Sequence, residues 1–562
     1  MSRVRVLKSG AVWCVTAGIL LCVQAASADF VMGQPELLGA PFNSPADDWS
    51  MSVSADGLQT FFSSARPGGY GSDDLWMVTR DAADEPWGEP VNLGPSVNTS
   101  ASEGYPSISA DGLTLFFSEM FASTIARPLR PGGMGGQDLW MVTRPTTESE
   151  WGTPTNLGSV VNSTADERSP CISSDGLSLY LASNRPGGSG TLDLWVTTRP
   201  DTDSPWTTPV NLGPAINSSD DDADPSLSAD GLTLFFASWG RPAGSGSHDL
   251  YVATRDSVMD PWRAAVNLGP SVNSSSGDGC PCFWAGGPTL FFISYRSGGP
   301  GGFDFRQLPI TPVLDFSGDG KVDGREVAIM AELWGQDELV ADIAPAPFGD
   351  GTVDVQDLLV LAGHIGEQVD DPTLVAHWAL DETEGTAASD SAGSYHATVM
   401  GVPTWRPTGG TVDGALECDG TTFVVANFVL DPSDGPLCVL AWIKGGRPGQ
   451  AIISQQAGAD WLMVDPTMGT LMTELRSGGR QSSLLGSEAV VTDGDWHRVG
   501  FVWDGSRRRL YVDGVLVAED TDVALDHCSG GLLLACGKLM TPDSFFTGLL
   551  DDVRIYSRAV RP

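Results

Sequence analysis

The chain has 562 residues, among them 68 glycines and 38 prolines, and its formal net charge is −40. This length exceeds what one hydrophobic core supports and predicts three or four domains. The acidic balance argues against nucleic acids and anionic membranes as partners and suits cations or neutral sugars, although it also serves solubility alone.

The N-terminus has the pattern of a secretory signal peptide over residues 1–28. Arg3, Arg5 and Lys8 precede an apolar run at 11–23, and a small-x-small cleavage site follows at 26–28. No later stretch approaches the length of a membrane-spanning helix. The sequence therefore predicts an exported protein that is secreted, periplasmic or at the cell surface, without a membrane span.

The cysteines beyond this segment are too sparse to form the main scaffold. Four of them fall in the C-terminal part and could form two disulfides, whose connectivity the sequence does not fix. Cys280 and Cys282 are too close together for an ordinary zinc knuckle. The cysteines are Cys171, Cys280, Cys282, Cys418, Cys438, Cys528 and Cys536.

The first half of the chain repeats one unit. A degenerate fifth copy of the unit runs through 283–292, and an insertion around 119–129 lengthens the second one. A period of this size with β-type alternation predicts the blades of a propeller. The motif S-x-D-G-L marks the units at Asp56, Asp111, Asp175 and Asp230.

Each unit contains four predicted strands. In the second unit we expect the inner strand at 105–109 and its partner at 114–118, joined by a tight Asp111-Gly112 turn. The fifth unit lacks its last strand, while the segment 35–43 (PELLGAPFN) matches 90–98 (PVNLGPSVN). The N-terminal strand is thus predicted to complete the last blade and close a five-bladed ring over 29–311.

The order S-x-D-G-L, then R-P-G-G, then D-L-W resembles the TolB-type, WD-repeat-like propellers over residues 35–310. That resemblance implies a protein-interaction scaffold attached to other domains.

Three charged positions recur in every unit, and topology places them all on one rim. One interpretation is a carboxylate-ringed mouth for a cation or basic peptide. The other is a set of ion pairs that braces the blades, which repetition favours. The candidate ligand-binding acids are Asp48, Glu103, Glu167, Asp222 and Asp278. The arginines are Arg66, Arg130, Arg185, Arg241 and Arg296, and the later aspartates are Asp74, Asp138, Asp193, Asp249 and Asp304.

The sequence predicts no catalytic residue in the propeller. Sialidases carry an S-x-D-x-G-x-x-W box, whereas Asp and Gly are adjacent here and the tryptophan is missing. No nucleophile–base pair stands out. His248, the one histidine of this half, lies in a Ser/Gly-rich turn and is expected to be solvated.

Residues 315–326 (DFSGDGKVDGRE) follow the pattern of an EF-hand calcium loop. Gly320 occupies the position of the sharp turn, and a helix is expected directly afterwards, over 325–334. The predicted cofactor is calcium. Its ligands would be Asp315, Ser317, Asp319, the carbonyl of Lys321, Asp323 and Glu326.

A second loop matches only the later positions of this pattern, at 350–357, and a helix is expected over 358–364. Two such loops resemble a type I dockerin over 312–366, which implies a cohesin-like partner. The usual Ser/Thr recognition pair is replaced by Gly324-Arg325 and Val355-Gln356. A calcium-rigidified spacer is the alternative interpretation. The candidate ligands of this second loop are Asp342, Asp350, Thr352, Asp354 and Asp357.

After a linker at 367–373, β-type patterning returns over 374–562. The segments AHWALDE, DWHR, LYVDG and LLDDVRIY resemble a laminin-G-like, concanavalin A-like jelly roll. This resemblance implies binding of sugars or proteins, with calcium held by Asp381, Asp390 and Asp551. Trp461 could stack on a sugar ring, or belong to the core.

The predicted fold class is therefore mainly β: a five-bladed propeller, a small α-helical calcium-loop module and a C-terminal β-sandwich jelly roll. We expect a secreted, non-catalytic binding or adhesion protein that recognises extracellular glycan or protein through the jelly roll. The alternatives are a secreted carbohydrate-active enzyme or accessory subunit with a site in the propeller channel, and a purely architectural component.

Overall fold

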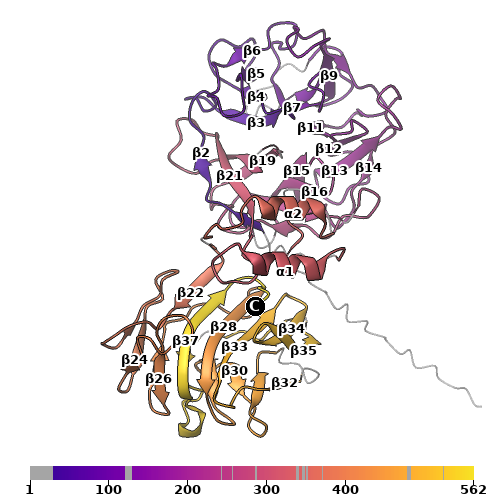
Figure 1. Cartoon of the computed structure of the whole chain (residues 1–562). Coiled ribbons are helices and arrows are strands. Elements are labelled where there is room, and N and C mark those ends of the chain that lie inside the picture. Colours follow the sequence, from indigo (N-terminus) through magenta and orange to yellow (C-terminus); the bar gives the residue numbers. More distant parts are fainter. Residues whose placement is uncertain are drawn as a thin grey trace, which may run out of the picture.

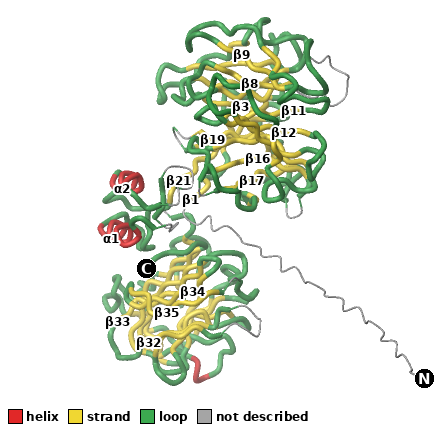
Figure 2. The backbone as a smooth tube through the Cα atoms, turned by 90° about the vertical axis from the view of Figure 1, so that its right-hand side faces the viewer, coloured by secondary structure: helices red, strands yellow, loops and turns green. Residues whose placement is uncertain are grey.

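The computed structural model describes residues 30–119, 130–241, 244–255, 257–284, 286, 288–336, 341–344, 349, 352–369, 371–476, 483–522, 524–528 and 530–562. The expected signal peptide, most of the insertion near residue 120, and Asp350 lie outside these residues. The mainly β fold class is confirmed, because a five-bladed propeller is followed by two helices and a two-sheet jelly roll (Figures 1 and 2). Within the described part of the chain, no helix is long and apolar enough to cross a membrane.

The first four blades are antiparallel sheets of four strands in chain order, and the innermost strands surround the middle of the propeller (Figure 1). The first two blades contain β3 (Asp48–Val53), β4 (Gln59–Ser64), β5 (Asp74–Thr79), β6 (Val91–Asn92), β7 (Glu103–Ile108), β8 (Thr114–Glu119), β9 (Leu139–Thr143) and β10 (Thr155–Asn156). The next two contain β11 (Glu167–Ile172), β12 (Ser178–Ser183), β13 (Asp193–Thr198), β14 (Val210–Asn211), β15 (Asp221–Leu227), β16 (Thr233–Trp239), β17 (His248–Thr254) and β18 (Val266–Asn267).

The repeated S-x-D-G-L motif forms the turn between the first two strands of a blade. In blade 1 the Ser54 hydroxyl donates to Asp56 over 2.6 Å, and Asp56 also accepts the amide of Leu58. Gly57 has φ +70°, a left-handed conformation that suits glycine. Serine, aspartate and glycine recur together because each satisfies a different need of this turn.

The N-terminal segment completes the fifth blade. β19 (Asp278–Trp284), β20 (Thr289–Ser294) and β21 (Asp304–Pro312) come from residues after 277, and β1 (Phe30–Met32) and β2 (Glu36–Leu37) both pair with β21. Asn43 fixes the closure, because its amide nitrogen donates to the Phe305 carbonyl and its carbonyl oxygen accepts the Phe305 amide. These contacts join positions 262 residues apart.

Two short helices follow the propeller, α1 (Gly324–Leu333) and α2 (Val355–Ala362). Each begins with a capping box, in which Asp323 caps α1 and Asp354 caps α2. Phe316, Met330 and Leu361 belong to the small core shared by the two loops and helices. The module lies between the propeller and the jelly roll (Figure 1).

The jelly roll consists of two eight-stranded antiparallel sheets. The first contains β22 (Leu374–Trp378), β25 (Thr404–Trp405), β26 (Leu416–Asp419), β28 (Leu437–Gly445), β33 (Trp496–Trp503), β34 (Arg507–Val512), β35 (Val515–Thr521) and β37 (Thr547–Tyr556). The second contains β23 (Ala387–Ala388), β24 (Ala397–Met400), β27 (Phe423–Val425), β29 (Ala451–Gln455), β30 (Asp460–Val464), β31 (Thr470–Thr473), β32 (Leu485–Val490) and β36 (Leu532–Leu534).

All seven described cysteines are free thiols, so the two disulfides considered for the C-terminal part do not form. Burial raises the pKa of Cys418 and of Cys438 to about 12. Such thiols behave as small apolar side chains, which agrees with their buried positions.

Candidate active site at the mouth of the propeller channel

The five acids predicted as ligands form ion pairs with the five repeated arginines. The distances are 2.8 Å for Arg66–Asp48, 3.3 Å for Arg130–Glu103, 2.9 Å for Arg185–Glu167, 2.7 Å for Arg241–Asp222 and 2.9 Å for Arg296–Asp278. All five carboxylates are fully buried. The arginines also donate to carbonyls of the incoming loop, as Arg66 does to Phe42. This ring therefore braces the blades.

The aspartates at the third recurring position accept hydrogen bonds from loop amides. Asp74 accepts the amides of Tyr70 and Gly71 and the side-chain amide of Asn92. Asp138, Asp193 and Asp249 likewise accept loop amides. These aspartates hold the loops between the second and third strands in place, and among the described residues no ion pair joins them to the five arginines.

The residues that break the five-fold symmetry lie on the innermost strands. Each stands two positions after one of the five acids that pair with an arginine. Four of them have left-handed backbone conformations at a break in the strand register: Tyr105 (φ 54°), Ser169 (φ 52°), Asp224 (φ 55°) and Cys280 (φ 47°). A proline follows each one, and proline suits a bulge because it has no amide to pair. Strained positions of this kind gather at functional sites.

Asp224 is the centre of this group. Its carboxylate accepts the Ser169 hydroxyl over 2.7 Å and the Cys280 thiol over 3.3 Å, so three blades meet there. Gly279 leaves space beside it: a Cβ at Gly279 would lie 3.8 Å from Asp224 Oδ2 and 3.9 Å from His248 Cδ2. Asp224 and His248 therefore border the same space.

His248 was predicted to be solvated, but the structure shows it half-buried. It begins β17, its ring centroid lies 4.4 Å from that of Trp239, and its Nδ1 lies 2.9 Å from the Ser247 hydroxyl. Burial lowers the pKa of His248, which favours the neutral imidazole. The Ser/Gly-rich composition of the turn led to the wrong prediction of a solvated side chain, because His248 belongs to the strand that follows the turn.

Arg168 and Tyr105 complete the inner part of the site. The Nε of Arg168 is buried and has no hydrogen-bond partner in the described structure. Burial raises the pKa of the Tyr105 phenol, the charge of Asp224 raises it further, and Arg168 opposes the shift. Tyr105 therefore keeps its proton and has a hydroxyl hydrogen to donate.

Asp221 lies three residues before Asp224, at the start of the same strand, and is only partly buried. Burial raises the pKa of Asp221, Arg168 lowers it, and neighbouring carboxylates including Asp222 raise it. Its strand partner is Trp239, which in turn pairs with His248. These blades thus bring together an acid of raised pKa, a second carboxylate, a buried guanidinium nitrogen and an indole.

This arrangement suits chemistry on a sugar. A carboxyl group that keeps its proton can act as a general acid, while a second carboxylate can stabilise positive charge or activate water. Aromatic faces and multiple hydrogen-bond donors are the usual means of holding a sugar ring. Sequence analysis missed these residues because it followed the positions that repeat. Tyr105 and Asp224 occupy the position that varies before each proline, and Arg168 and Asp221 lie directly beside repeated acids.

In the jelly roll, the structure brings together two of the three predicted calcium ligands. The amide of Gly414 donates to Asp381, and Asp551 accepts the amides of Thr411 and Val412, so both acids face one loop. Asp551 Oδ1 is buried and has no hydrogen-bond partner. Asp390 lies apart.

The carboxylate of Asp390 is occupied by the amides of His377, Ala392 and Tyr395. Trp461 is fully buried in the jelly-roll core. It therefore cannot stack on a sugar, and the core interpretation applies.

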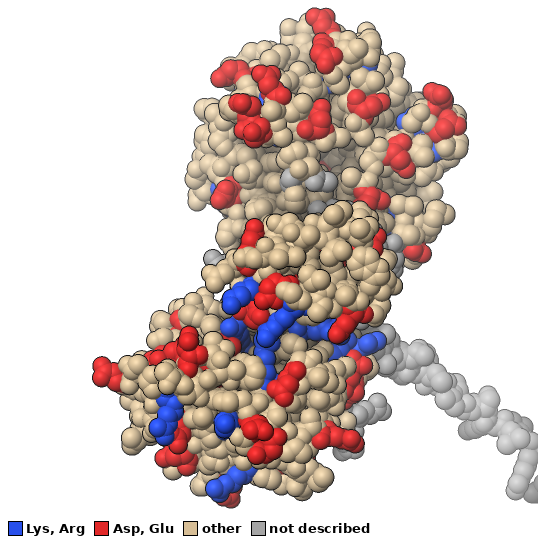
Figure 3. All heavy atoms as spheres, viewed as in Figure 1, with Lys and Arg blue, Asp and Glu red and all other residues tan. Residues whose placement is uncertain are grey.

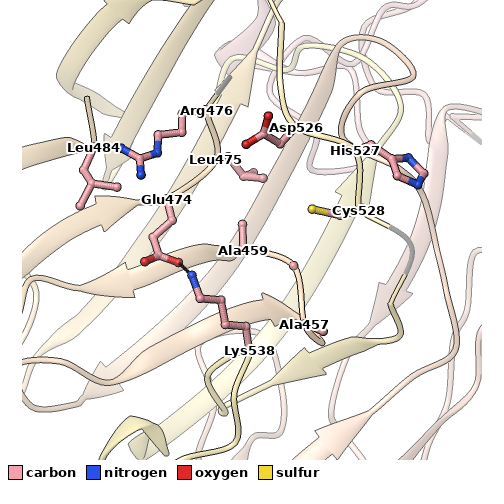
Figure 4. A pocket seen from close by; sticks show the side chains of 11 residues that line it. Ala457, Ala459, Glu474, Leu475, Arg476, Leu484, Asp526, His527, Cys528 and Lys538 are labelled. Carbon is pink, nitrogen blue, oxygen red and sulfur yellow. Dashed lines mark hydrogen bonds and ion pairs between the residues drawn. The ribbon is translucent and has the colours of Figure 1, made fainter. Parts of the chain in front are cut away.

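The jelly roll also has a polar cavity of about 510 Å³. Figure 4 shows Glu474 paired with Lys538 on one wall, with Arg476 and Asp526 beyond them. Burial raises the pKa of Asp460, which accepts the amide of Lys538 and donates its own amide to Glu474. The walls offer both donors and acceptors but, apart from His527, no aromatic ring.

Residues 419–562 match the concanavalin A-like lectin/glucanases superfamily. The C-terminal domain is therefore a laminin-G-like, concanavalin A-like jelly roll. The match reaches neither the propeller nor the helical module, so the TolB-type and dockerin resemblances remain expectations from sequence. Among curated proteins, no sequence matches this chain.

Among solved structures, the chain is similar to the sialidase of Trypanosoma rangeli, with 10% identity over 92% of each chain and a TM-score of 0.43. The chain is also similar to domain 4 of AbnA, a GH43 extracellular arabinanase from Geobacillus stearothermophilus solved with arabinotriose. This match has 19% identity over 34% of this chain and 94% of that chain, and a TM-score of 0.25.

The prediction of a non-catalytic binding protein is contradicted by the sialidase neighbours, which are enzymes and cover nearly the whole chain. At 10% identity and with TM-scores below 0.5, these neighbours do not identify the substrate or reaction of this chain.

The first predicted calcium loop has a donor set that fits the ion. Asp315, Asp319 and Glu326 each place a carboxylate oxygen within 4.8 Å of the others. Burial raises the pKa of Asp315 and of Glu326, and a cation between them would favour their ionised forms. Ser317 lies in the same loop, and Gly320 takes φ +86° at its turn.

Two further predicted ligands of the first loop, Asp323 and Lys321, make contacts elsewhere in the module. Asp323 caps α1 by accepting the Arg325 amide, and the backbone of Lys321 bridges to Gln368.

In the second loop, Asp357 accepts the amides of Ile343, Ala344 and Asp354, all within 2.7 Å. The buried Asp342 lies against Gly349, and Asp354 caps α2. Thr352 belongs to the described part of this loop and Asp350 does not. Backbone amides thus satisfy the acid at the last position of this loop.

Proposed function

We propose that this chain is an exported carbohydrate-active enzyme that hydrolyses a glycosidic bond at the mouth of its propeller channel. The observation that carries the proposal is the cluster around Asp224, which breaks the symmetry of an otherwise uniform ring. Four blades contribute to it through Tyr105, Arg168, Asp224 and Cys280.

The chemistry of each side chain suggests a role. Asp221, whose pKa is raised, would protonate the departing glycosidic oxygen as the general acid. Asp224 would face the positive charge that develops on the sugar ring as that bond breaks. Water would then add to the anomeric carbon and give its proton to the carboxylate of Asp221, which restores the acid. Arg168 would donate its unpartnered Nε to a substrate oxygen, and Trp239 would support one face of the sugar.

The test is hydrolysis of a panel of aryl glycosides and extracellular polysaccharides by the mature chain. Asp221→Asn and Asp224→Asn should each reduce turnover by a factor of about 10² or more. The matched control is Asp166→Asn, because Asp166 holds the position of Asp221 in blade 3 and accepts the Gln137 amide there. No hydrolysis of any panel member, or equal rates in all three variants, would contradict the proposal.

We also propose that the first loop binds calcium through Asp315, Ser317, Asp319, the Lys321 carbonyl, Asp323 and Glu326. The clustering of three carboxylates at its centre supports this assignment. Calorimetric titration of the full chain with calcium chloride, after removal of metal by EDTA, should detect one site that Asp319→Asn abolishes. Unchanged binding in that variant would place the metal elsewhere.

A further inference from the structure

The jelly roll holds the backbone of the first loop directly. Four consecutive carbonyls of the loop accept hydrogen bonds from it. Arg558 donates to Asp315 over 2.6 Å and the Arg561 amide to Phe316 over 2.9 Å. Arg498 donates to Ser317 over 3.4 Å, and both Arg554 and Tyr556 donate to Gly318, over 2.8 and 2.9 Å.

The contact is tight as well as polar. A Cβ at Gly318 would lie 2.7 Å from Val560 Cγ1 and 3.2 Å from the Tyr556 hydroxyl, and Gly318 takes φ +67°. Arg558 also pairs with Asp371 over 2.8 Å, with both side chains only 2% exposed. Basic side chains gather at this boundary between the helices and the jelly roll (Figure 3).

The first loop therefore presents carboxylates to a cation on its inner side and backbone carbonyls to the jelly roll on its outer side. The carboxylates of Asp315, Asp319 and Glu326 converge on the inside, while the carbonyls of 315–318 point to the jelly roll. Without a cation, three carboxylates within 4.8 Å of one another repel. Any relaxation of the loop then moves the carbonyls that the arginines hold.

We propose that a divalent cation in the first loop locks the jelly roll onto the helical module, so that metal binding and domain docking are coupled. This inference rests on the calcium site proposed above and is independent of the channel chemistry. Coupling is reciprocal: the docked jelly roll raises the affinity of the loop for calcium by the same factor by which calcium strengthens docking.

The first experiment uses the unmodified full chain. Small-angle X-ray scattering in calcium chloride and in EDTA should give a larger radius of gyration in EDTA, because the jelly roll is released. If calorimetry detects no calcium site, both the calcium proposal and the lock fail. If calcium binds but the radius of gyration is the same in both conditions, the lock alone is refuted.

The second experiment measures the coupling from the other side. The double variant Arg554→Gln, Tyr556→Phe removes both donors to Gly318 and leaves every carboxylate of the loop in place. Its calcium affinity should fall by a factor of about 10. Arg406→Gln is the control, since Arg406 pairs with Glu417 within the jelly roll and should leave the affinity unchanged. Equal affinities in all three proteins would overturn the lock.

Discussion

The carboxylate of Asp224 accepts the hydroxyl of Ser169 from the neighbouring blade over 2.7 Å, at a point where both residues have positive φ. Two strained backbones from neighbouring blades thus meet through one hydrogen bond. The cost of each strained residue is of the order of 1–3 kcal/mol, and the surrounding blades maintain it.

Removing the acid of raised pKa should change the pH profile of activity. Because Asp221 acts with its proton in place, activity should fall as pH rises through its raised pKa. Asp221→Asn should lower kcat by a factor of about 10² or more and remove this alkaline limb. An alkaline limb that survives in the variant would assign the acid to another group.

The arginine ring should govern the stability of the propeller. Arg66→Met leaves Asp48 buried without its cation, so the free energy of unfolding should fall by about 3 kcal/mol in urea titration. Arg406→Gln, whose side chain is 53% exposed, should cost less than about 1 kcal/mol. Equal effects of the two changes would show that the ring does not brace the blades.

Closure of the ring should depend on Asn43. Asn43→Ala leaves the amide and carbonyl of Phe305 without their partner, which should cost about 2 kcal/mol. Asn162→Ala removes the equivalent contacts to Leu139 in blade 2 and should cost a similar amount. Only Asn43→Ala should also expose residues 30–43 to limited proteolysis, which mass spectrometry would detect. Similar cleavage in both variants would contradict a special role in closure.

The stability of the jelly roll should decrease from pH 5 to pH 8 in EDTA. Burial raises the pKa of Asp551 to about 7, so the folded state keeps a proton that the unfolded chain releases near pH 4. The folded state then binds more protons in this window, and stability falls as pH rises. Asp551→Asn should flatten this dependence in thermal melts. An unchanged slope in the variant would assign it to another group.

The architecture could be predicted because its signals are periodic and local. The S-x-D-G-L turn, the matching segments 35–43 and 90–98, and the loop at 315–326 each express one physical requirement that sequence alone displays. The channel site could not be predicted, since Tyr105, Arg168 and Asp224 come from three blades and meet only when those blades pack against one another. The sequence analysis also missed a set of four arginine–tryptophan contacts, one in each of the first four units. The guanidinium carbons of four arginines lie 4.2 to 4.4 Å from the ring centroids of four tryptophans: Arg80 from Trp87, Arg144 from Trp151, Arg199 from Trp206 and Arg255 from Trp262.

The pairing of Asn43 with Phe305 has a consequence for how the chain folds. It joins residues 262 positions apart, so the last blade cannot be completed until nearly all of the propeller has been synthesised. Contacts of such long sequence separation slow folding, because the entropy of closing the loop is lost before the contact forms. During that delay the edge of β21 lacks its strand partners, and the face of β3 that packs against the fifth blade is uncovered. These two surfaces, at the ends of an open arc, are where we expect the nascent protein to aggregate.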